Sequence, residues 1–319
     1  KGFSRKNKKY DYWPSDKTNQ EQAGRLFFLF LFSHRNLTLA NHKYVARQSN
    51  SDKCFFSRYY KMKIHLYQND IEWENPEENI IRANKSLSEI EISSGDLIIL
   101  PEMFSTGFSM RSELCIEMEE EKNKTFHFLQ RLAILNSCCV IAGVTTKINE
   151  NFFNESLALL PNKKIISYRK NHLFSPAKEH MTFTAGDEIK TFEWNQWIIG
   201  MSICYDLRFP ELYRELAAKR TNLMVNIANW PLDRIEHWIT LLKARAIENQ
   251  SFIIGVNRTG TDPNSTYNGN SMIIDPMGKV VLDAGESPGV YGSTIEIETV
   301  NSWRKTFPAL SNMRKIKSR

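Results

Sequence analysis

Short apolar runs recur along the chain from Met62 onwards, separated by polar stretches. Each run is continuously apolar or alternates between apolar and polar positions, which is typical of buried and half-buried strands. Predicted strands cover residues 64–67, 96–100, 140–144, 157–160, 165–168, 197–204, 223–227, 252–256, 271–275, 279–282 and 294–297.

Four segments between these runs have the periodicity of amphipathic helices. One begins at Asn75-Pro76, where a capping side chain precedes a proline in the first turn. Others cover residues 126–133 and 211–219, and the last follows Asp233-x-x-Glu236, a predicted capping box. Because strands and helices alternate, the pattern predicts a layered α/β domain.

Residues 1–61 do not share this pattern. Their apolar run at 26–32 (LFFLFLF) is too short to span a bilayer, and Ser33-His34-Arg35 after it is a poor signal-peptide cleavage site. We therefore expect the folded domain to cover residues 62–319. Residues 1–61 are then an N-terminal extension that is disordered or not part of the native domain; a genuine mobile tail is the alternative.

Charge follows the same division. Residues 1–61 contain 13 Lys/Arg and 4 Asp/Glu, whereas the rest of the chain contains 29 and 32, so the net charge of +6 comes from the extension. The main domain therefore has no electrostatic case for a nucleic-acid partner. With 41% hydrophobic and 24% charged residues, the composition is that of a globular protein rather than a membrane protein.

The chain has five cysteines: Cys54, Cys115, Cys138, Cys139 and Cys204. Their number is odd, and they form neither a C-x-x-C pair nor a metal-ligand spacing with histidine. This pattern predicts neither a disulfide framework nor a metal site, and it favours a reducing, cytoplasmic environment.

Three predicted strands run into a reactive side chain, at Glu102, Lys170 and Cys204. Active sites of layered α/β folds commonly lie just beyond strand ends. Taken singly, each residue has an ordinary interpretation: a solvated loop acid, a surface lysine and a small buried thiol. The occurrence of all three residues at strand ends is what suggests a catalytic site.

These three residue types together suit amide hydrolysis. A cysteine thiolate is the nucleophile, and a carboxylate can take the thiol proton and later give it to departing ammonia. A lysine ammonium can stabilise the oxyanion of the tetrahedral intermediate, with the backbone N–H of Tyr205 as a second donor. Water would then hydrolyse the acyl-thioester, with Glu102 as base.

The surrounding motifs resemble the nitrilase superfamily of carbon–nitrogen hydrolases. They are LPEMF at 100–104, YRKNHLF at 168–174 and CYDLRFP at 204–210, within a resemblance that covers residues 63–297. The resemblance implies a four-layer α-β-β-α sandwich, a homodimer formed through helices, and no metal or organic cofactor. It also implies a second glutamate after the lysine motif, for which Glu179 is the candidate; a surface loop acid is the alternative.

Further segments resemble the omega-amidase branch: FSTGFSM at 104–110, FTAG at 183–186, NWP at 229–231 and the stretch 237–250. That resemblance implies hydrolysis of the terminal amide of 2-oxoglutaramate or 2-oxosuccinamate to the dicarboxylate and ammonia. Such enzymes act after transamination of glutamine or asparagine, including the transamination that closes methionine salvage.

A substrate of this kind carries a carboxylate, for which Arg208 and Arg234 are candidate partners. Each could instead form a structural ion pair. Phe104, Tyr205 and Trp230 are candidate pocket walls, with ordinary core positions as the alternative. Carbamoylase, nitrilase or aliphatic amidase activity with the same three residues, and a non-catalytic binding protein on the same scaffold, are the competing functions.

Overall fold

The computed structural model describes residues 61–116 and 123–314. The predicted N-terminal extension lies outside the described residues except for Lys61, which begins the first strand. No helix within the described ranges is long and apolar enough to cross a bilayer.

Two six-stranded mixed sheets form the centre of the domain. The strands of the first are β1 Lys61–Gln68, β2 Leu97–Ile99, β3 Cys139–Ile148, β4 Asn151–Leu159, β5 Ile165–Arg169 and β14 Gly289–Glu296, in the order β14-β1-β2-β3-β4-β5. The strands of the second are β6 Thr191–Trp194, β7 Trp197–Ile203, β8 Leu223–Ala228, β9 Phe252–Asn257, β12 Met272–Ile274 and β13 Val280–Asp283, in the order β13-β12-β9-β8-β7-β6. A separate hairpin pairs β10 Thr259–Thr261 with β11 Thr266–Asn268.

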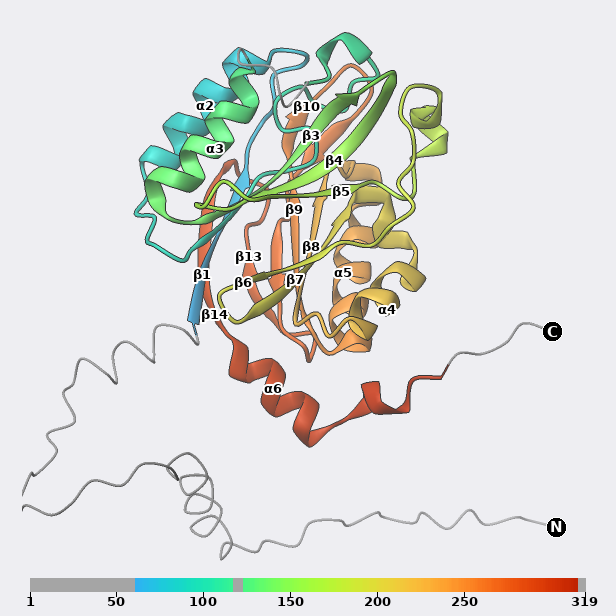
Figure 1. Cartoon of the computed structure of the whole chain (residues 1–319). Helices are drawn as coiled ribbons and strands as arrows, with labels where there is room; N and C mark the ends of the chain where they lie inside the picture. The colour runs from blue at the N-terminus through green and yellow to red at the C-terminus, as the bar shows by residue number, and fades with distance from the viewer. Residues whose placement is uncertain (1–60, 117–122, 315–319) are drawn as a thin grey trace, which may run out of the picture. The chain divides into compact units, whose positions relative to one another are not determined.

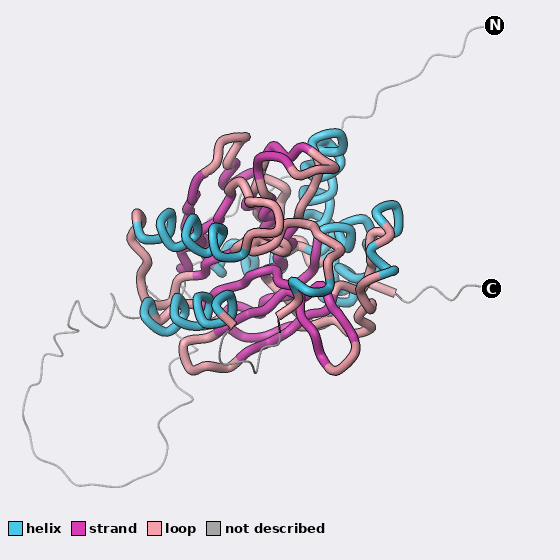
Figure 2. The backbone as a smooth tube through the Cα atoms, turned by 90° about the horizontal axis from the view of Figure 1, so that it is seen from above, coloured by secondary structure: helices cyan, strands magenta, loops and turns pink. Residues whose placement is uncertain are grey.

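Helices cover the outer face of each sheet (Figure 1). Helices α2 Pro76–Ser88 and α3 Lys124–Asn136 lie on the first sheet, and α4 Pro210–Ala218 and α5 Ile235–Asn249 lie on the second, while α6 Ile297–Thr306 follows β14. Seen from above, the strands lie between groups of helices (Figure 2). The predicted four-layer α-β-β-α sandwich is therefore confirmed.

The pleat of the strands divides the core into two apolar clusters. In β2, Ile99 faces the cluster between the sheets, whereas its neighbour Ile98 faces the cluster under α2 and α3. Both residues are fully buried, as in a sheet covered on both faces. This double burial explains why strands such as 96–100 are continuously apolar in the sequence.

Two local predictions differ from the structure. The predicted capping box is wrong: η5 Leu232–Arg234 precedes α5, and the Asp233 carboxylate accepts a hydrogen bond from Arg234 Nη1 at 2.7 Å. The predicted strand 157–160 is the end of a longer strand, since β4 begins at Asn151. Its first half carries the buried polar residues Asn154 and Glu155, which masked the strand in the hydrophobic pattern.

Candidate active site

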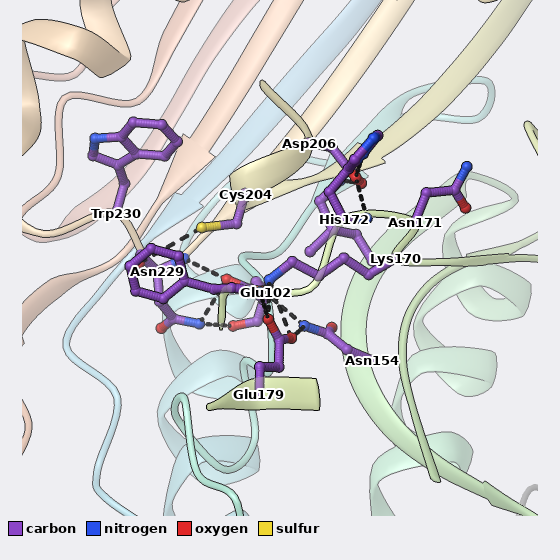
Figure 3. A network of polar contacts seen from close by, with 12 residues as sticks. Glu102, Asn154, Lys170, Asn171, His172, Glu179, Cys204, Asp206, Asn229 and Trp230 are labelled. Atoms are coloured by element: carbon purple, nitrogen blue, oxygen red, sulfur yellow. Dashed lines mark hydrogen bonds and ion pairs between the residues drawn. The ribbon is translucent and has the colours of Figure 1, made fainter. Parts of the chain in front are cut away.

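Three strand ends bring Glu102, Lys170 and Cys204 together between the two sheets (Figure 3). Glu102 lies three residues beyond β2 and Lys170 directly follows β5, both in the first sheet. Cys204 directly follows β7 of the second sheet and begins the 3-10 helix η4 Cys204–Arg208. Glu102 and Lys170 are fully buried, whereas Cys204 is half-buried.

Lys170 lies between two carboxylates. Its Nζ donates to Glu102 Oε1 at 2.8 Å and to Glu179 at 2.9 Å (Oε2) and 3.1 Å (Oε1). Glu179 begins η3 Glu179–Met181 and is fully buried, so it is not a surface loop acid. Since an ammonium has three protons, Lys170 can donate to a further acceptor only by giving up one of its two bonds to Glu179.

Two asparagines orient the carboxylates of this group. Asn154 on β4 donates through Nδ2 to Glu102 Oε1 and to Glu179 Oε1, both at 2.8 Å. Asn229, which follows β8, donates its backbone N–H to Glu102 Oε2 at 2.9 Å and its Nδ2 to the Glu102 carbonyl at 2.8 Å. Glu102 is therefore held at both oxygens and at its backbone, which fixes its orientation.

A glycine on β3 lets the Glu102 segment approach closely. A Cβ added at Gly143 would lie 2.4 Å from Glu102 Cα and 2.7 Å from the backbone nitrogen of Met103. Any side chain at this position would therefore displace the backbone that carries Glu102.

Cys204 has a left-handed backbone conformation, with φ of +43°. For a residue other than glycine this conformation costs roughly 1–2 kcal/mol, so the surroundings must hold it. Buried Asp206 does so by accepting the Ile203 N–H (2.9 Å), the His172 N–H (2.9 Å), His172 Nδ1 (2.7 Å) and the Tyr168 hydroxyl (2.7 Å). His172 thus supports the turn through Asp206, its ring stacked on Phe209.

The start of η4 supplies backbone donors next to the thiol. The first N–H groups of a helix have no acceptor within the helix, and Tyr205 is the second residue of η4. Its N–H is therefore available to an oxyanion formed at Cys204. On the other side, the Cys204 thiol lies 3.8 Å from the Asn229 carbonyl, which accepts its weak hydrogen bond.

The charges around Glu102 and Lys170 fix the protonation states of these two side chains. Burial alone would raise the pKa of the Glu102 carboxyl, but the Lys170 charge and the surrounding hydrogen-bond donors lower it below the ordinary 4.5. Burial alone would lower the pKa of Lys170, but the two glutamates raise it well above its ordinary value. The resting site thus contains an ionised Glu102 and a protonated Lys170.

The thiol is neutral in this resting state. Burial and the negative charge of Glu102 raise the pKa of Cys204 well above that of an ordinary thiol, and Lys170 offsets this only in part. An ionised carboxylate that is ready to accept a proton therefore accompanies a thiol that still carries one. This arrangement can transfer the proton as the sulfur attacks an electrophile.

These protonation states predict a broad pH profile. Since the pKa of Glu102 is lowered, its contribution to folding stability is present above the unfolded-state value of 4.5 and is lost as pH falls through the lower folded-state value. We expect kcat/KM to be flat between about pH 5 and pH 9, because none of the three groups changes charge in that window. Circular dichroism at each pH separates unfolding from titration, and an acid limb centred above about pH 6 would contradict these assignments.

A cavity of about 440 Å³ opens above Cys204. Its lining residues are Phe108, Met110, Phe174, Pro176, Ala177, Cys204, Tyr205, Arg208, Asn229, Trp230, Pro231, Arg234, Asp262, Asn264, Ser265 and Tyr267. Aromatic walls with a few polar groups are typical of a small-molecule site. The volume suits a substrate of a few carbon atoms rather than a polypeptide.

Four of the predicted pocket residues line this cavity. They are Tyr205, Trp230, Arg208 and Arg234. Phe104 does not line this cavity and takes the core position given as its alternative, because its ring is 1% exposed and packs under α3 near Phe128, with ring centroids 6.3 Å apart.

The sequence interpretation missed both asparagines and part of the cavity wall. Asn154 belongs to an N-E-S triplet on a strand that the hydrophobic pattern did not show. Asn229 belongs to the NWP motif, but nothing in that motif indicates contact with Glu102. Phe108, Phe174 and the β10–β11 residues could be placed at the cavity only by the fold.

The site is built from proton-transfer groups rather than metal ligands. Among residues 61–116 and 123–314, no three histidine, cysteine or acidic side chains are gathered as metal ligands would be. Both carboxylates instead form ion pairs with the single ammonium of Lys170.

Comparisons with known proteins agree with this geometry. The family model for carbon-nitrogen hydrolase matches residues 63–305. The chain is 35% identical to "Omega-amidase YafV" of Yersinia enterocolitica and 35% identical to "2-oxoglutaramate amidase" of Bacillus subtilis, in each case over 80% of this chain and 98% of the relative.

This fold is similar to the solved structure of XC1258 from Xanthomonas campestris, a CN-hydrolase superfamily protein. That structure is described as carrying an arsenic adduct in its active site. It has a TM-score of 0.74 and 32% identity, and the match covers 81% of this chain and 99% of that one. The predicted resemblance is thus confirmed. The chain belongs to the carbon–nitrogen hydrolase family and is a hydrolase of the amidase type, acting on carbon–nitrogen bonds other than peptide bonds.

Proposed function

We propose that this enzyme is an omega-amidase, which hydrolyses the terminal amide of 2-oxoglutaramate or 2-oxosuccinamate to the dicarboxylate and ammonia. The observation that carries the proposal is that Arg208 lines the cavity above Cys204 without a carboxylate partner among the described residues. An amide with a carboxylate at its far end matches such a cavity. The names of the two bacterial relatives agree with it.

The first half of the proposed reaction forms a thioester. The substrate carbonyl oxygen lies between the Lys170 ammonium, which gives up one of its two bonds to Glu179, and the Tyr205 N–H. Glu102 takes the thiol proton as Cys204 Sγ attacks the carbonyl carbon, so that the carbonyl π electrons move to the oxygen and give an oxyanion. When the oxyanion collapses, Glu102 returns that proton to the nitrogen, and the C–N bond breaks to release ammonia.

The second half regenerates the enzyme. A water molecule loses a proton to Glu102 and attacks the thioester carbonyl, with the same two donors at the oxyanion. The C–S bond then breaks, the sulfur recovers its proton from Glu102, and the carboxylic acid leaves. Glu179 acts through Lys170 and Asn154. It accepts hydrogen bonds from both side chains and so fixes their positions.

The two arginines of the cavity differ in their partners. Arg234 Nη1 already donates to Asp233 at 2.7 Å. Arg208 lies over the Trp230 ring at 4.8 Å, and both its Nη atoms are 3.3 Å from Nδ1 of His237, so neither contact is with a carboxylate. We therefore assign the substrate carboxylate to Arg208, because a carboxylate would give its guanidinium a charged, bidentate acceptor.

This assignment predicts a binding defect. We expect Arg208→Met to raise KM for 2-oxoglutaramate by about 10- to 100-fold, which is the loss expected for a hydrogen bond between charged groups. The turnover of a short uncharged amide such as propionamide should be unchanged. Steady-state kinetics with Arg234→Met as the matched control checks it, and a larger effect at Arg234 would contradict the assignment.

A substrate panel tests the proposed function itself. Ammonia release is measured with 2-oxoglutaramate, 2-oxosuccinamate, glutamine, an N-carbamoyl amino acid, a simple nitrile and propionamide. We expect kcat/KM to be highest for the two 2-oxo amides. If glutamine is hydrolysed as fast as 2-oxoglutaramate, the omega-amidase proposal fails, and a preference for the carbamoyl compound, the nitrile or propionamide would assign the carbamoylase, nitrilase or aliphatic amidase function instead.

We also propose a homodimer formed through the helical layers, as the family resemblance implies. Ile247 on α5 and Met277 beyond β12 are apolar side chains that are 54% and 52% exposed. Pairing of two helical layers would cover them. Light scattering on the purified protein tests this, and a monomer at micromolar concentration would refute it.

A further inference from the structure

The β10–β11 hairpin forms a wall of the cavity but belongs to neither large sheet. Asp262, Asn264, Ser265 and Tyr267 of this hairpin line the cavity. Strand β11 also packs against η5, which carries Arg234. Because a two-stranded hairpin is marginally stable by itself, its position over the cavity must be fixed by other contacts.

Arg258 fixes the base of this hairpin. Its side chain is fully buried, and Nη2 donates to Asp70 Oδ1 (3.1 Å), to the Ile71 carbonyl (2.9 Å) and to the Thr261 carbonyl (3.1 Å). The backbone N–H of Thr259 adds a bond to the Asn69 carbonyl at 3.0 Å. These bonds tie the hairpin to the segment that follows β1.

Two glycines lie next to the residues of this packing. A Cβ at Gly260, where φ is +83°, would lie 1.8 Å from Asp70 Oδ1, so only glycine fits beside that carboxylate. A Cβ at Gly107 would lie 3.5 Å from Arg258 Nη1, which places the guanidinium against the residue before Phe108. Arg258 thus contacts the hairpin and also the loop that supplies another cavity wall.

Tyr267 connects Arg258 to the cavity. Its ring lies 4.5 Å from the Arg258 guanidinium carbon, a cation–π contact, and its hydroxyl donates to Asp262 Oδ2 at 2.6 Å. Asp262 Oδ1 accepts the backbone N–H groups of Asn264 and Ser265 at 2.7 and 2.8 Å. Since burial and Asp262 raise the pKa of Tyr267, the hydroxyl keeps its proton and remains the donor.

Stability alone is a weak reason for a buried arginine here. Nη1 of Arg258 is buried without a hydrogen-bond acceptor in the part of the chain that the structure describes. An unpaired buried donor is destabilising, and apolar substitutes for buried charges are often equally stable. The guanidinium instead provides one rigid group that fixes the positions of two cavity walls relative to each other.

We propose that Arg258 and Tyr267 are positioning residues that hold the β10–β11 hairpin as the recognition wall for the remote, non-reacting end of the substrate. The inference rests on the proposed function, because it requires a substrate that extends beyond its amide. The oxygens of Asp262 are occupied by donors of the hairpin itself. The wall therefore offers a shaped polar surface whose carboxylate already accepts three hydrogen bonds from the hairpin, which weakens it as a partner for the α-ammonium group of an amino acid.

Removal of a single hydroxyl provides the test. Tyr267→Phe keeps the ring over Arg258 but frees Asp262, so we expect KM for 2-oxoglutaramate to rise by about tenfold, the loss of one hydrogen bond to a charged acceptor, with kcat within about twofold. Activity on propionamide should not change, and the ratio of glutamine to 2-oxoglutaramate hydrolysis should rise. Tyr291→Phe on β14, which removes a hydroxyl that donates to the Ser287 carbonyl, is the matched control.

Arg258→Lys is the second variant, since a lysine keeps the charge but cannot hold the same set of acceptors. It should show the same KM effect, and its thermal unfolding is recorded in parallel. Equal loss of kcat on 2-oxoglutaramate and propionamide in Tyr267→Phe would overturn the inference, as would unchanged kinetics on both. If the wild-type enzyme does not prefer 2-oxoglutaramate to propionamide, it is the proposed function that fails, so the two failures are distinguishable.

Discussion

Cys204→Ala is expected to lower amide hydrolysis by at least about 10⁴-fold, because removal of the nucleophile of a covalent hydrolase leaves only binding and oxyanion stabilisation. The loss should fall on kcat, while the affinity for 2-oxoglutaramate should persist, since the cavity walls and Arg208 are unchanged. Ammonia release and equilibrium binding by calorimetry measure the two quantities separately.

Cys115→Ala is the matched control, because Cys115 is also a free, half-buried thiol but belongs to the segment after η1 Ser112–Leu114, away from the cavity. It should retain full activity. The loss of a nucleophile is expected to remove nearly all activity. If Cys204→Ala kept more than a few per cent of wild-type kcat, the covalent mechanism would be wrong.

Lys170→Met is expected to damage both catalysis and folding. The substitution leaves Glu102 and Glu179 buried without their cation, and breaking a buried ion pair in this way costs about 3–5 kcal/mol of unfolding free energy. Loss of one oxyanion donor should also lower kcat by about 10²- to 10³-fold. Urea unfolding and ammonia release measure the two effects.

The pH dependence of this variant should have the opposite sign to that of the wild type. Without Lys170, burial raises the folded-state pKa of Glu102, so the folded state binds more protons and gains stability as pH falls. In the wild type the lowered pKa of Glu102 means that its contribution is lost as pH falls. Lys124→Met, at an exposed lysine paired with Glu77, should change stability by less than about 1 kcal/mol. A similar cost at both lysines would contradict the proposed network.

The site residues that could be recognised in the sequence combine a reactive side chain with a position at a strand end. Glu102, Lys170 and Cys204 each lie at or within three residues of a strand end, so strand ends and reactive side chains could be recognised together. The layered α/β class was equally accessible, because strands buried on both faces are continuously apolar, whereas the two-sheet sandwich followed from the family resemblance.

The site residues that the sequence interpretation missed do not combine a reactive side chain with a position at a strand end. Asn154 and Asn229 have no reactivity of their own, and only their contacts with the Glu102 carboxylate give them a role. Phe104 and Phe108 are alike in the sequence, yet a turn lies between them, in which the Met103 carbonyl accepts the Gly107 N–H at 2.8 Å and Gly107 has φ of +72°. One ring is buried under α3 and the other lines the cavity. A hydrophobic pattern does not encode such a turn.

The central claim is that Cys204 forms an acyl-thioester with the 2-oxo dicarboxylate monoamide. The most direct measurement is a single-turnover experiment with enzyme in excess over 2-oxoglutaramate, quenched in acid and analysed by mass spectrometry. We predict a 2-oxoglutaryl group on the peptide that contains Cys204, which appears as ammonia is released and disappears as 2-oxoglutarate forms. Simultaneous release of ammonia and 2-oxoglutarate, with no acyl group on that peptide at any time, would contradict the account.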